Sequence, residues 1–203
     1  MIANPILVTG IRTTIIQELI KLLPADSGAV WFDYEKPIIG DAHRYVFAAG
    51  VLYNKPLSEQ TGDEIAESLF VNMVNVITAC EYLLEHDPYA RICVIGSKAG
   101  EAGSYDQTYA AAKAGIHNYV RNARIIQDQQ IVCIAPTIIM DSGMTRRRNN
   151  EGIKALEMRR KKHPKKRYLQ AIEVARLIYF LLYIDQGFIT NTVIKMKGGP
   201  GWW

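Results

Sequence analysis

A tyrosine and a lysine stand four residues apart near the middle of the chain. The run Tyr109-Ala-Ala-Ala-Lys113 falls in a helical stretch, so both side chains would share one helix face. A free phenol titrates near pH ~10, and an adjacent ammonium favours the phenolate form. Such a pair could move a proton near neutral pH. The spacing often arises by chance, so the surrounding residues decide its meaning.

Two polar residues upstream could act on the same proton. Ser97 follows the apolar run Ile92–Ile95, and its hydroxyl could donate to the carbonyl oxygen that Tyr109 would protonate. Asn72 falls inside a long helical segment, an unfavourable place for a residue that prefers caps. Its amide could hold a water on a proton path to Lys113. Each also has a structural explanation: a strand-end hydroxyl, a solvent-facing amide and a surface Tyr–Lys pair.

A glycine and an acid nearer the start of the chain could serve a dinucleotide. The run Ile6–Thr9 leads into Gly10 and then a helical stretch, and such a turn points backbone N–H groups and a helix dipole at a diphosphate. The usual motif has three glycines and only Gly10 is present, so a plain strand–helix turn is the alternative. Asp33, 23 residues later, could bind the adenosine ribose hydroxyls or simply form a turn.

Short apolar runs rich in β-branched residues would position these side chains. They alternate with helical stretches at Glu64–Glu85, Thr108–Ile126 and Ala171–Ile184. The alternation predicts one α/β domain over residues 1–203, a doubly wound parallel sheet of Rossmann-like type that binds ligands beyond its carboxyl edge. The predicted strands are Ile6–Thr9, Val30–Asp33, Tyr45–Ala48, Ile92–Ile95, Ile131–Ile134 and Val193–Met196.

Taken in order, these residues resemble the short-chain dehydrogenase/reductase family. The resemblance is carried by Thr9-Gly10, Ala49-Gly50, Asn72, Ser97, Tyr109 with Lys113, Pro136 and Gly198-Gly199. It implies hydride transfer between NAD or NADP and a small carbonyl/alcohol substrate. Tyr109 would be the acid/base, Lys113 would lower its pKa and hold the nicotinamide ribose, Ser97 would orient the substrate and Asn72 would support the proton relay. The implied cofactor-binding residues are Gly10, Arg12, Thr14, Ile15, Asp33, Ala49, Gly50, Tyr109, Lys113, Pro136 and Ile139.

The chain departs from the family pattern in the adenosine half of the cofactor site. Thr14 and Ile16 replace the second and third glycines, and their side chains are expected to crowd the diphosphate. Only twelve residues join Asp33 to Val46, too few for the usual helix–strand–helix, which predicts a shortened, divergent member with a reduced adenosine-binding region. Asp33 favours NAD, whereas Arg12 could pair with the 2′-phosphate of NADP. The alternative function is a catalytically weak or inactive nucleotide-sensing or scaffold protein.

The net charge of +4 conceals one strongly basic segment. Residues 146–167 hold eleven Lys or Arg and two acids, a balance of +9. The segment, about 142–168, falls where the family places a mobile substrate lid, so it predicts an anionic substrate. A solvated helix kept soluble by its charge is the alternative. Nucleic acid is not expected as a partner, because no aromatic residues interleave with the charges.

Cysteine use and hydropathy indicate an ordinary cytoplasmic domain. Cys80, Cys93 and Cys133 are odd in number and widely spaced, which predicts buried free thiols and no metal cluster. The longest apolar run, Leu177–Ile184, is far shorter than the ~20 residues of a membrane span, and no secretion signal is visible. Trp202-Trp203 would cover a subunit interface of a homodimer or homotetramer, or pack on the chain's own core.

Overall fold

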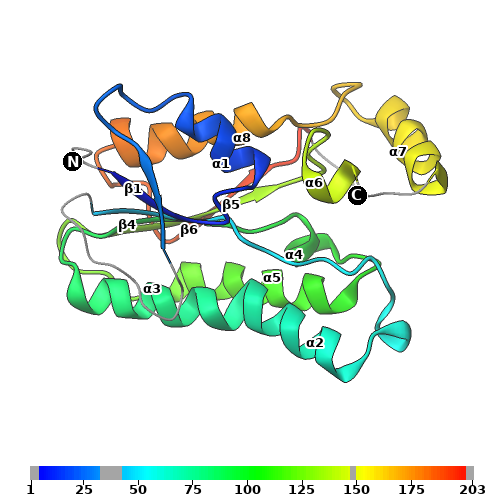
Figure 1. Ribbon diagram of the computed structural model, residues 1–203, viewed down its shortest axis with the longest axis horizontal. Coiled ribbons are helices and arrows are strands. Elements are labelled where there is room, and N and C mark those ends of the chain that lie inside the picture. The colour runs from blue at the N-terminus through cyan, green and yellow to red at the C-terminus, as the bar shows by residue number, and fades with distance from the viewer. Residues whose placement is uncertain (1–4, 33–42, 147–149, 200–203) are drawn as a thin grey trace.

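One parallel sheet organises the chain in the computed structural model, which describes residues 5–32, 43–146 and 150–199. The strand order is β2-β1-β3-β4-β5-β6 (Figure 1). The strands are β1 (Ile6–Thr9), β2 (Ala29–Trp31), β3 (Arg44–Phe47), β4 (Arg91–Ile95), β5 (Gln130–Pro136) and β6 (Thr192–Met196). All six predicted strands are confirmed, with ends shifted by at most two residues. The doubly wound parallel α/β fold is confirmed with them.

Helices cover both faces of the sheet. α1 and α8 lie on one face, and α2, α3 and α5 lie on the other, while α7 stands apart beyond the strand ends (Figure 1). The helices are α1 (Thr14–Ile20), α2 (Gly62–Leu69), α3 (Asn75–His86), α4 (Ala99–Ala102), α5 (Gln107–Asn122), α6 (Gly143–Arg146), α7 (Asn150–Lys162) and α8 (Ala171–Tyr179). Within the described ranges, no helix combines the length and apolarity that crossing a bilayer requires.

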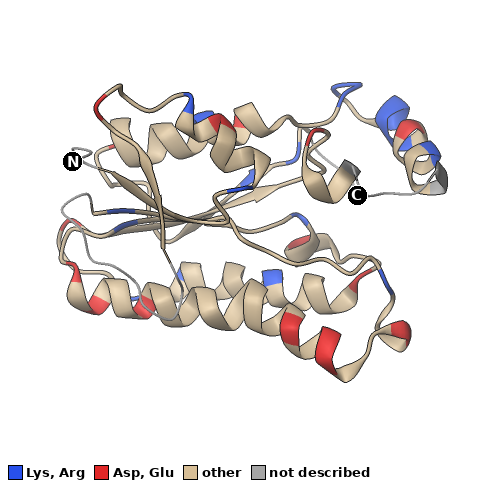
Figure 2. Cartoon of the chain, in the orientation of Figure 1, with Lys and Arg blue, Asp and Glu red and all other residues tan. Residues whose placement is uncertain are grey.

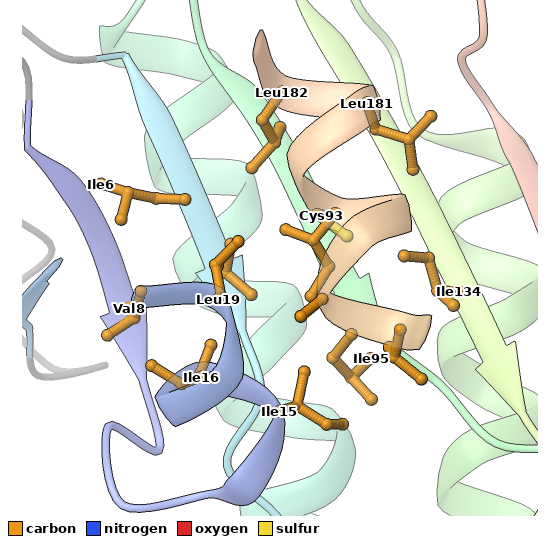
Figure 3. Close-up of a cluster of buried hydrophobic side chains, with 14 of the residues drawn as sticks. Ile6, Val8, Ile15, Ile16, Leu19, Cys93, Ile95, Ile134, Leu181 and Leu182 are labelled. Carbon is orange, nitrogen blue, oxygen red and sulfur yellow. The ribbon is translucent and has the colours of Figure 1, made fainter. Parts of the chain in front are cut away.

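Two apolar clusters, one on each face, hold the layers together. Along β1, Ile6 and Val8 belong to the cluster under α1 and α8, whereas Leu7 belongs to the cluster under α3 and α5. Figure 3 shows the first cluster, where side chains of α1 pack on those of the strands. Burying one such Ile or Leu side chain stabilises a fold by roughly 1.5–3 kcal/mol. Strands buried on both faces read as continuous apolar runs, which is why the sequence predicts them well.

The three cysteines are confirmed as free, buried thiols. Cys93 lies in the first cluster, and Cys80 and Cys133 lie in the second. Trp202 and Trp203 fall outside the described residues, so their place at a subunit interface, and the homodimer or homotetramer, remain predictions.

Two of the predicted helices contain a π-helical turn. The stretch Glu64–Glu85 forms α2, the turn η2 (Phe70–Val74) and α3, while Ala171–Ile184 forms α8 and the turn η3 (Phe180–Ile184). α5 ends at Asn122, four residues before the predicted end. The side-chain amide of Asn191 donates to the carbonyls of Val120 and Ala123 and so satisfies the end of that helix.

Candidate active site

The carboxyl ends of four strands bring the predicted residues to one edge of the sheet. Gly10 follows β1, Gly50 follows β3, Ser97 follows β4, and Pro136 ends β5. The chain runs from β1 outward to β2 and then crosses to β3, so β1 and β3 flank the point where the connections diverge. Ligands in such sheets bind at this point.

Tyr109 lies in the first turn of α5 and meets Ser97 there. The Asp106 carboxylate begins the helix by accepting the Tyr109 backbone N–H at 3.0 Å, and it also accepts the Tyr53 N–H at 3.0 Å. The Ser97 side chain lies close enough to the phenol to act on its proton, and the Ser97 hydroxyl itself accepts the Ala99 N–H at 3.1 Å. Burial raises the pKa of Tyr109, the Ser97 side chain opposes that rise, and the charge of Asp106 adds to it. In this structure the phenol therefore holds its proton.

Lys113 lies beside Tyr109 but its ammonium is bonded elsewhere. Its Nζ atom is 5.7 Å from the centre of the Tyr109 ring and donates to the Ile95 carbonyl at 2.9 Å. Burial lowers the pKa of Lys113 to about 8. The expected lowering of the pKa of Tyr109 by Lys113 is not found here, because the ammonium points to the end of β4.

Asn72 lies inside the π-helical turn and is fully buried. Its amide nitrogen donates to the carbonyls of Val51 and Ser68, both at 2.9 Å, and its Oδ1 accepts the Val51 N–H at 3.2 Å. The amide therefore clamps the loop after β3 to the helix. Both of its N–H groups are thus used within the protein, and the water that its amide could hold on a path to Lys113 stays a prediction. A positioning role in the site remains a prediction.

The turn after β1 has a shape that fits a phosphate group. Gly10 has a φ of 67°, and a Cβ there would lie 2.7 Å from the Ala49 backbone nitrogen, so only glycine fits. Thr9 holds the two strand ends together, because its Oγ1 accepts the N–H groups of Ala48 and Ala49. Among the described residues, the buried hydroxyl of Thr13 has no hydrogen-bond partner. A phosphate oxygen would supply one.

The residues that replace the family's glycines do not fill this turn. The side chains of Ile15 and Ile16 are buried in the core with Val8 (Figure 3), so the expectation that Ile16 crowds the diphosphate is wrong. The Thr14 hydroxyl donates to the Asp141 carbonyl at 3.2 Å, which ties the turn to the loop after β5. α1 is rotated about its axis so that Ile15 and Ile16 face the core, while Thr14 faces the loop after β5.

The other predicted cofactor residues are spread around the same edge. Arg12 is exposed beside the turn. The Pro136 carbonyl accepts the Lys98 N–H at 2.9 Å, while the Ile139 side chain is buried in the core and its carbonyl accepts the Thr145 hydroxyl. Asp33, and with it the predicted adenosine contact, lies outside the described residues. β2 is the edge strand of the described sheet.

Cations gather next to Ser97 at a place that sequence reasoning only partly indicated. We define the cationic cluster as Lys98, Arg159 of α7 and Lys197, which follows β6. Burial lowers the pKa of Lys98, the charges of Arg159 and Lys197 lower it further, and Glu101 raises it. Glu101 is itself ion-paired with Lys195. Arg159 belongs to the basic segment that the sequence predicts to bind an anion, but no sequence pattern predicts that it acts on Lys98.

One buried histidine beside Ser97 was not among the site residues predicted from the sequence. His117 lies one turn beyond Lys113 on α5, and its Nε2 atom accepts the Ser97 backbone N–H at 3.4 Å. The repeated four-residue spacing from Tyr109 through Lys113 was the signal that could have identified it.

Comparisons with known proteins show what the chain is similar to. A family model described as enoyl-(acyl carrier protein) reductase matches residues 27–200. The 3-oxoacyl-(acyl-carrier-protein) reductase FabG of Buchnera aphidicola subsp. Baizongia pistaciae is 28% identical over 158 residues, which cover 74% of this chain and 63% of that protein. Levodione reductase of Leifsonia aquatica is 28% identical over 155 residues, covering 71% and 58%. The chain thus spans about 60% of the length of these relatives.

Solved structures share the fold at lower identity. A short-chain dehydrogenase family protein of Francisella tularensis superposes with a TM-score of 0.80 and 19% identity, over 97% of this chain and 98% of that one. A structure of ElxO with NADP bound gives a TM-score of 0.76, also at 19% identity and the same coverage.

Proposed function

Because the chain belongs to the short-chain dehydrogenase/reductase family, we propose that it is an NAD(P)-dependent oxidoreductase acting on a carbonyl/alcohol pair. The observation that carries the proposal is the convergence of Ser97, which follows β4, and Tyr109, in the first turn of α5, with the Lys113 ammonium 5.7 Å from the ring centre. The family relationship supports the general reaction class. The four roles of Asn72, Ser97, Tyr109 and Lys113 are part of the proposal.

In the reducing direction, Ser97 and Tyr109 hydrogen-bond the carbonyl oxygen of the substrate. A reduced nicotinamide, when bound, would supply the hydride that the carbonyl carbon takes up. Tyr109 gives its proton to the oxygen, so the C=O group becomes CH–OH and the phenol becomes phenolate. Lys113 stabilises that phenolate by turning from the Ile95 carbonyl toward the ring, since an opposite charge nearby favours the charged form. The oxidising direction reverses each step.

The turn after β1 supports a dinucleotide as the cofactor. Gly10 lets the backbones that follow β1 and β3 approach closely at this turn, and the Thr13 hydroxyl, which has no hydrogen-bond partner among the described residues, is available to donate to a diphosphate oxygen. We propose NAD or NADP, with NAD favoured by the carboxylate of Asp33 and NADP favoured by the exposed Arg12. ElxO, a protein of the same fold, has been solved with NADP bound.

The cationic cluster supports an anionic substrate. Lys98 directly follows Ser97, so a carboxylate or phosphate on a substrate held by Ser97 would meet the cluster. Like charges gathered in one place repel, and an anionic ligand relieves that repulsion. The lid role of the segment 142–168, which forms α6 and α7 in its described part, belongs to the same proposal.

The test combines cofactor binding with one substitution. Calorimetric titration with the oxidised and reduced forms of NAD and NADP should show binding of at least one pair. Tyr109→Phe should then lower kcat by about 10³-fold with the dinucleotide affinity unchanged, because only the transferable proton is lost. Tyr105→Phe is the matched control, since Tyr105 is exposed on the neighbouring loop and should keep full activity.

Each alternative has its own result. A protein that binds a dinucleotide yet turns over no member of a panel of ketones, aldehydes and oxo acids would be a nucleotide-sensing protein. A protein that binds none of the four dinucleotides would be a scaffold. Full activity of Tyr109→Phe would show that another group carries the proton.

A further inference from the structure

α5 presents three polar side chains, spaced four residues apart, to the end of β4. They are Tyr109, Lys113 and His117. The proposed function uses the first two and leaves the third without a role. We propose that His117 is a positioning residue for that reaction, and that its neutral imidazole holds the backbone of Ser97 so that the serine hydroxyl stays against Tyr109. The inference rests on the proposed function.

Three backbone groups at the end of β4 are held by two elements, α5 and β5. The Ile95 carbonyl accepts from Lys113 Nζ at 2.9 Å, and the Gly96 N–H donates to the Ile134 carbonyl at 2.8 Å. The Ser97 N–H donates to His117 Nε2 at 3.4 Å. The Ser97 hydroxyl accepts the Ala99 N–H at 3.1 Å, and the Ser97 carbonyl accepts the Gly100 N–H at 3.0 Å. His117 is therefore the anchor on the remaining backbone group of the serine, its N–H.

The imidazole packs directly against this stretch of backbone. A Cβ on Gly96 would lie 2.6 Å from His117 Nε2 and 2.5 Å from Cys133 Sγ, so the missing side chain makes the contact possible. His117 is only 3% exposed, and the close packing holds its ring in one position. Movement of the ring would shift the Ser97 backbone with it.

The surroundings of His117 favour its uncharged form. Lys113 and Arg121 face it from α5, Lys195 faces it from β6, and Glu101 faces it from α4. The Cys133 thiol of β5 stays protonated, because burial raises its pKa to about 12. Burial, Arg121 and Lys113 lower the pKa of His117 to about 4, against a smaller opposing effect of Glu101.

The charge state decides whether the contact exists. A neutral imidazole with its proton on Nδ1 has a lone pair on Nε2 that accepts the Ser97 N–H. Protonation would place an N–H group against that N–H and a second positive charge beside Lys113. The neutral ring thus holds the serine while Lys113 remains the local cation that Tyr109 needs.

Two substitutions separate positioning from simple packing. His117→Gln keeps an acceptor at nearly the same place and never titrates, whereas His117→Leu keeps the volume and removes the acceptor. His117→Leu should lower kcat about tenfold with the dinucleotide KM within about twofold, since a displaced serine hydroxyl loses alignment. His117→Gln should restore kcat to within about twofold of the parent protein. Equal kcat for the parent and His117→Leu would overturn the proposal.

A measurement on the unreacted protein keeps the proposal open to refutation even if His117→Leu does not fold. The chain has four histidines, so the difference between nitrogen NMR spectra of the parent and His117→Gln assigns the ring. The ring should be neutral and protonated on Nδ1 at pH 5.5, where a histidine with the ordinary pKa of about 6.5 is mostly charged. Titration near 6.5 would overturn the inference. A parent protein without turnover would refute the proposed function instead, and the ring's titration would still decide whether it holds Ser97.

Discussion

At the scale of single residues, Lys113 is a buried cation that, in the proposed function, serves the chemistry at the expense of stability. Its ammonium is buried, and burial lowers its pKa from 10.5 to about 8. The Ile95 carbonyl accepts a hydrogen bond from this ammonium, which compensates part of the lost hydration. A charge kept from water at this position serves the phenol of Tyr109 better than it serves the fold.

Lys113→Met should therefore stabilise the protein at pH 7 while lowering kcat strongly. The shift in pKa corresponds to about 3 kcal/mol, and about 1 kcal/mol is lost again because the Ile95 carbonyl loses its donor. The folded pKa lies below the unfolded one, so the unfolded chain binds more protons between about pH 8 and 10.5 and the parent gains stability as the pH rises. Urea denaturation at pH 7 and pH 10 measures the free energy of unfolding of the parent and the variant, and how each depends on pH.

The control and the contradicting result are both simple for this variant. Lys21→Met removes an exposed lysine that pairs only with Glu18 on its own helix, and it should change the free energy of unfolding little. The advantage of Lys113→Met should shrink at pH 10, where the parent lysine is largely neutral. A Lys113→Met protein less stable than the parent at pH 7 would mean that the buried ammonium is a net stabilising group.

At the scale of elements, the place where β1 and β3 meet is the proposed cofactor side of the site. Gly10 has a positive φ and lies against backbone atoms of Ala49. Backbone atoms at either residue can shift only at a substantial cost in free energy. Gly103, which ends α4, has a φ of 79° and open space around its missing Cβ. Both glycines have a positive φ, but Gly10 lies in close contact with the Ala49 backbone and Gly103 has open space around it.

Gly10→Ala should destabilise the protein more than Gly103→Ala. Both variants bear about 1 kcal/mol for an alanine at positive φ, and Gly10→Ala adds about 1–3 kcal/mol for the collision with β3. The collision also moves the phosphate turn, so dinucleotide affinity should fall at least about tenfold for Gly10→Ala alone. Denaturation and calorimetric titration of the two variants give the comparison. Equal losses of stability and affinity would show that the close contact is not needed.

Elements differ in how far the sequence predicts them. Apolar runs predicted all six strands, because burial on both faces leaves few other residue types acceptable in β1 or β5. The π-helical turn at Phe70–Val74 was not predictable, since it depends on the buried amide of Asn72 bonding to Val51, 21 residues earlier. Helical periodicity describes a helix alone and carries no record of such a partner.

The candidate site also combines features that local sequence patterns predict with features that depend on contacts between elements. The four-residue spacing placed Tyr109 and Lys113 on one face of α5, as predicted. The direction of the Lys113 ammonium was not predictable, because it is decided by a carbonyl of β4. Ile16 looks like an obstruction in the motif and proves to be core, since the orientation of α1 is set by packing against β1. Contacts between elements are thus the part that a single sequence conceals.

At the scale of the whole molecule, charge is separated between two regions. Acidic residues mark α2 and α3, while α7 is dominated by basic residues beyond the carboxyl ends of the strands (Figure 2). Ion pairs Arg160–Glu157 and Arg167–Glu173 neutralise part of the basic segment, and the cationic cluster at Lys98 adds to what remains. Such a field raises the local concentration of anions at the edge that carries Ser97.

A charged and an uncharged substrate of the same skeleton should therefore respond differently to salt. Raising the ionic strength screens the cluster, so the KM of an oxo carboxylate should rise several-fold between about 0.05 and 0.5 M salt. The KM of the matching neutral ketone should stay constant. Arg159→Gln should raise the KM of the oxo acid about fivefold at low salt, with kcat little changed, because the arginine acts on binding and touches no transferred atom.

Arg124→Gln is the matched control, since it removes the same charge from the exposed segment between α5 and β5, at the amino edge of the sheet. If net charge alone attracts the substrate, the two variants will raise KM equally and the cluster at Lys98 has no special part. If neither variant nor salt changes the KM of the oxo acid, the substrate is not recognised as an anion. A rise confined to Arg159→Gln and to the charged substrate would locate the recognition beside Ser97, at the end of the sheet where the chemistry is proposed to occur.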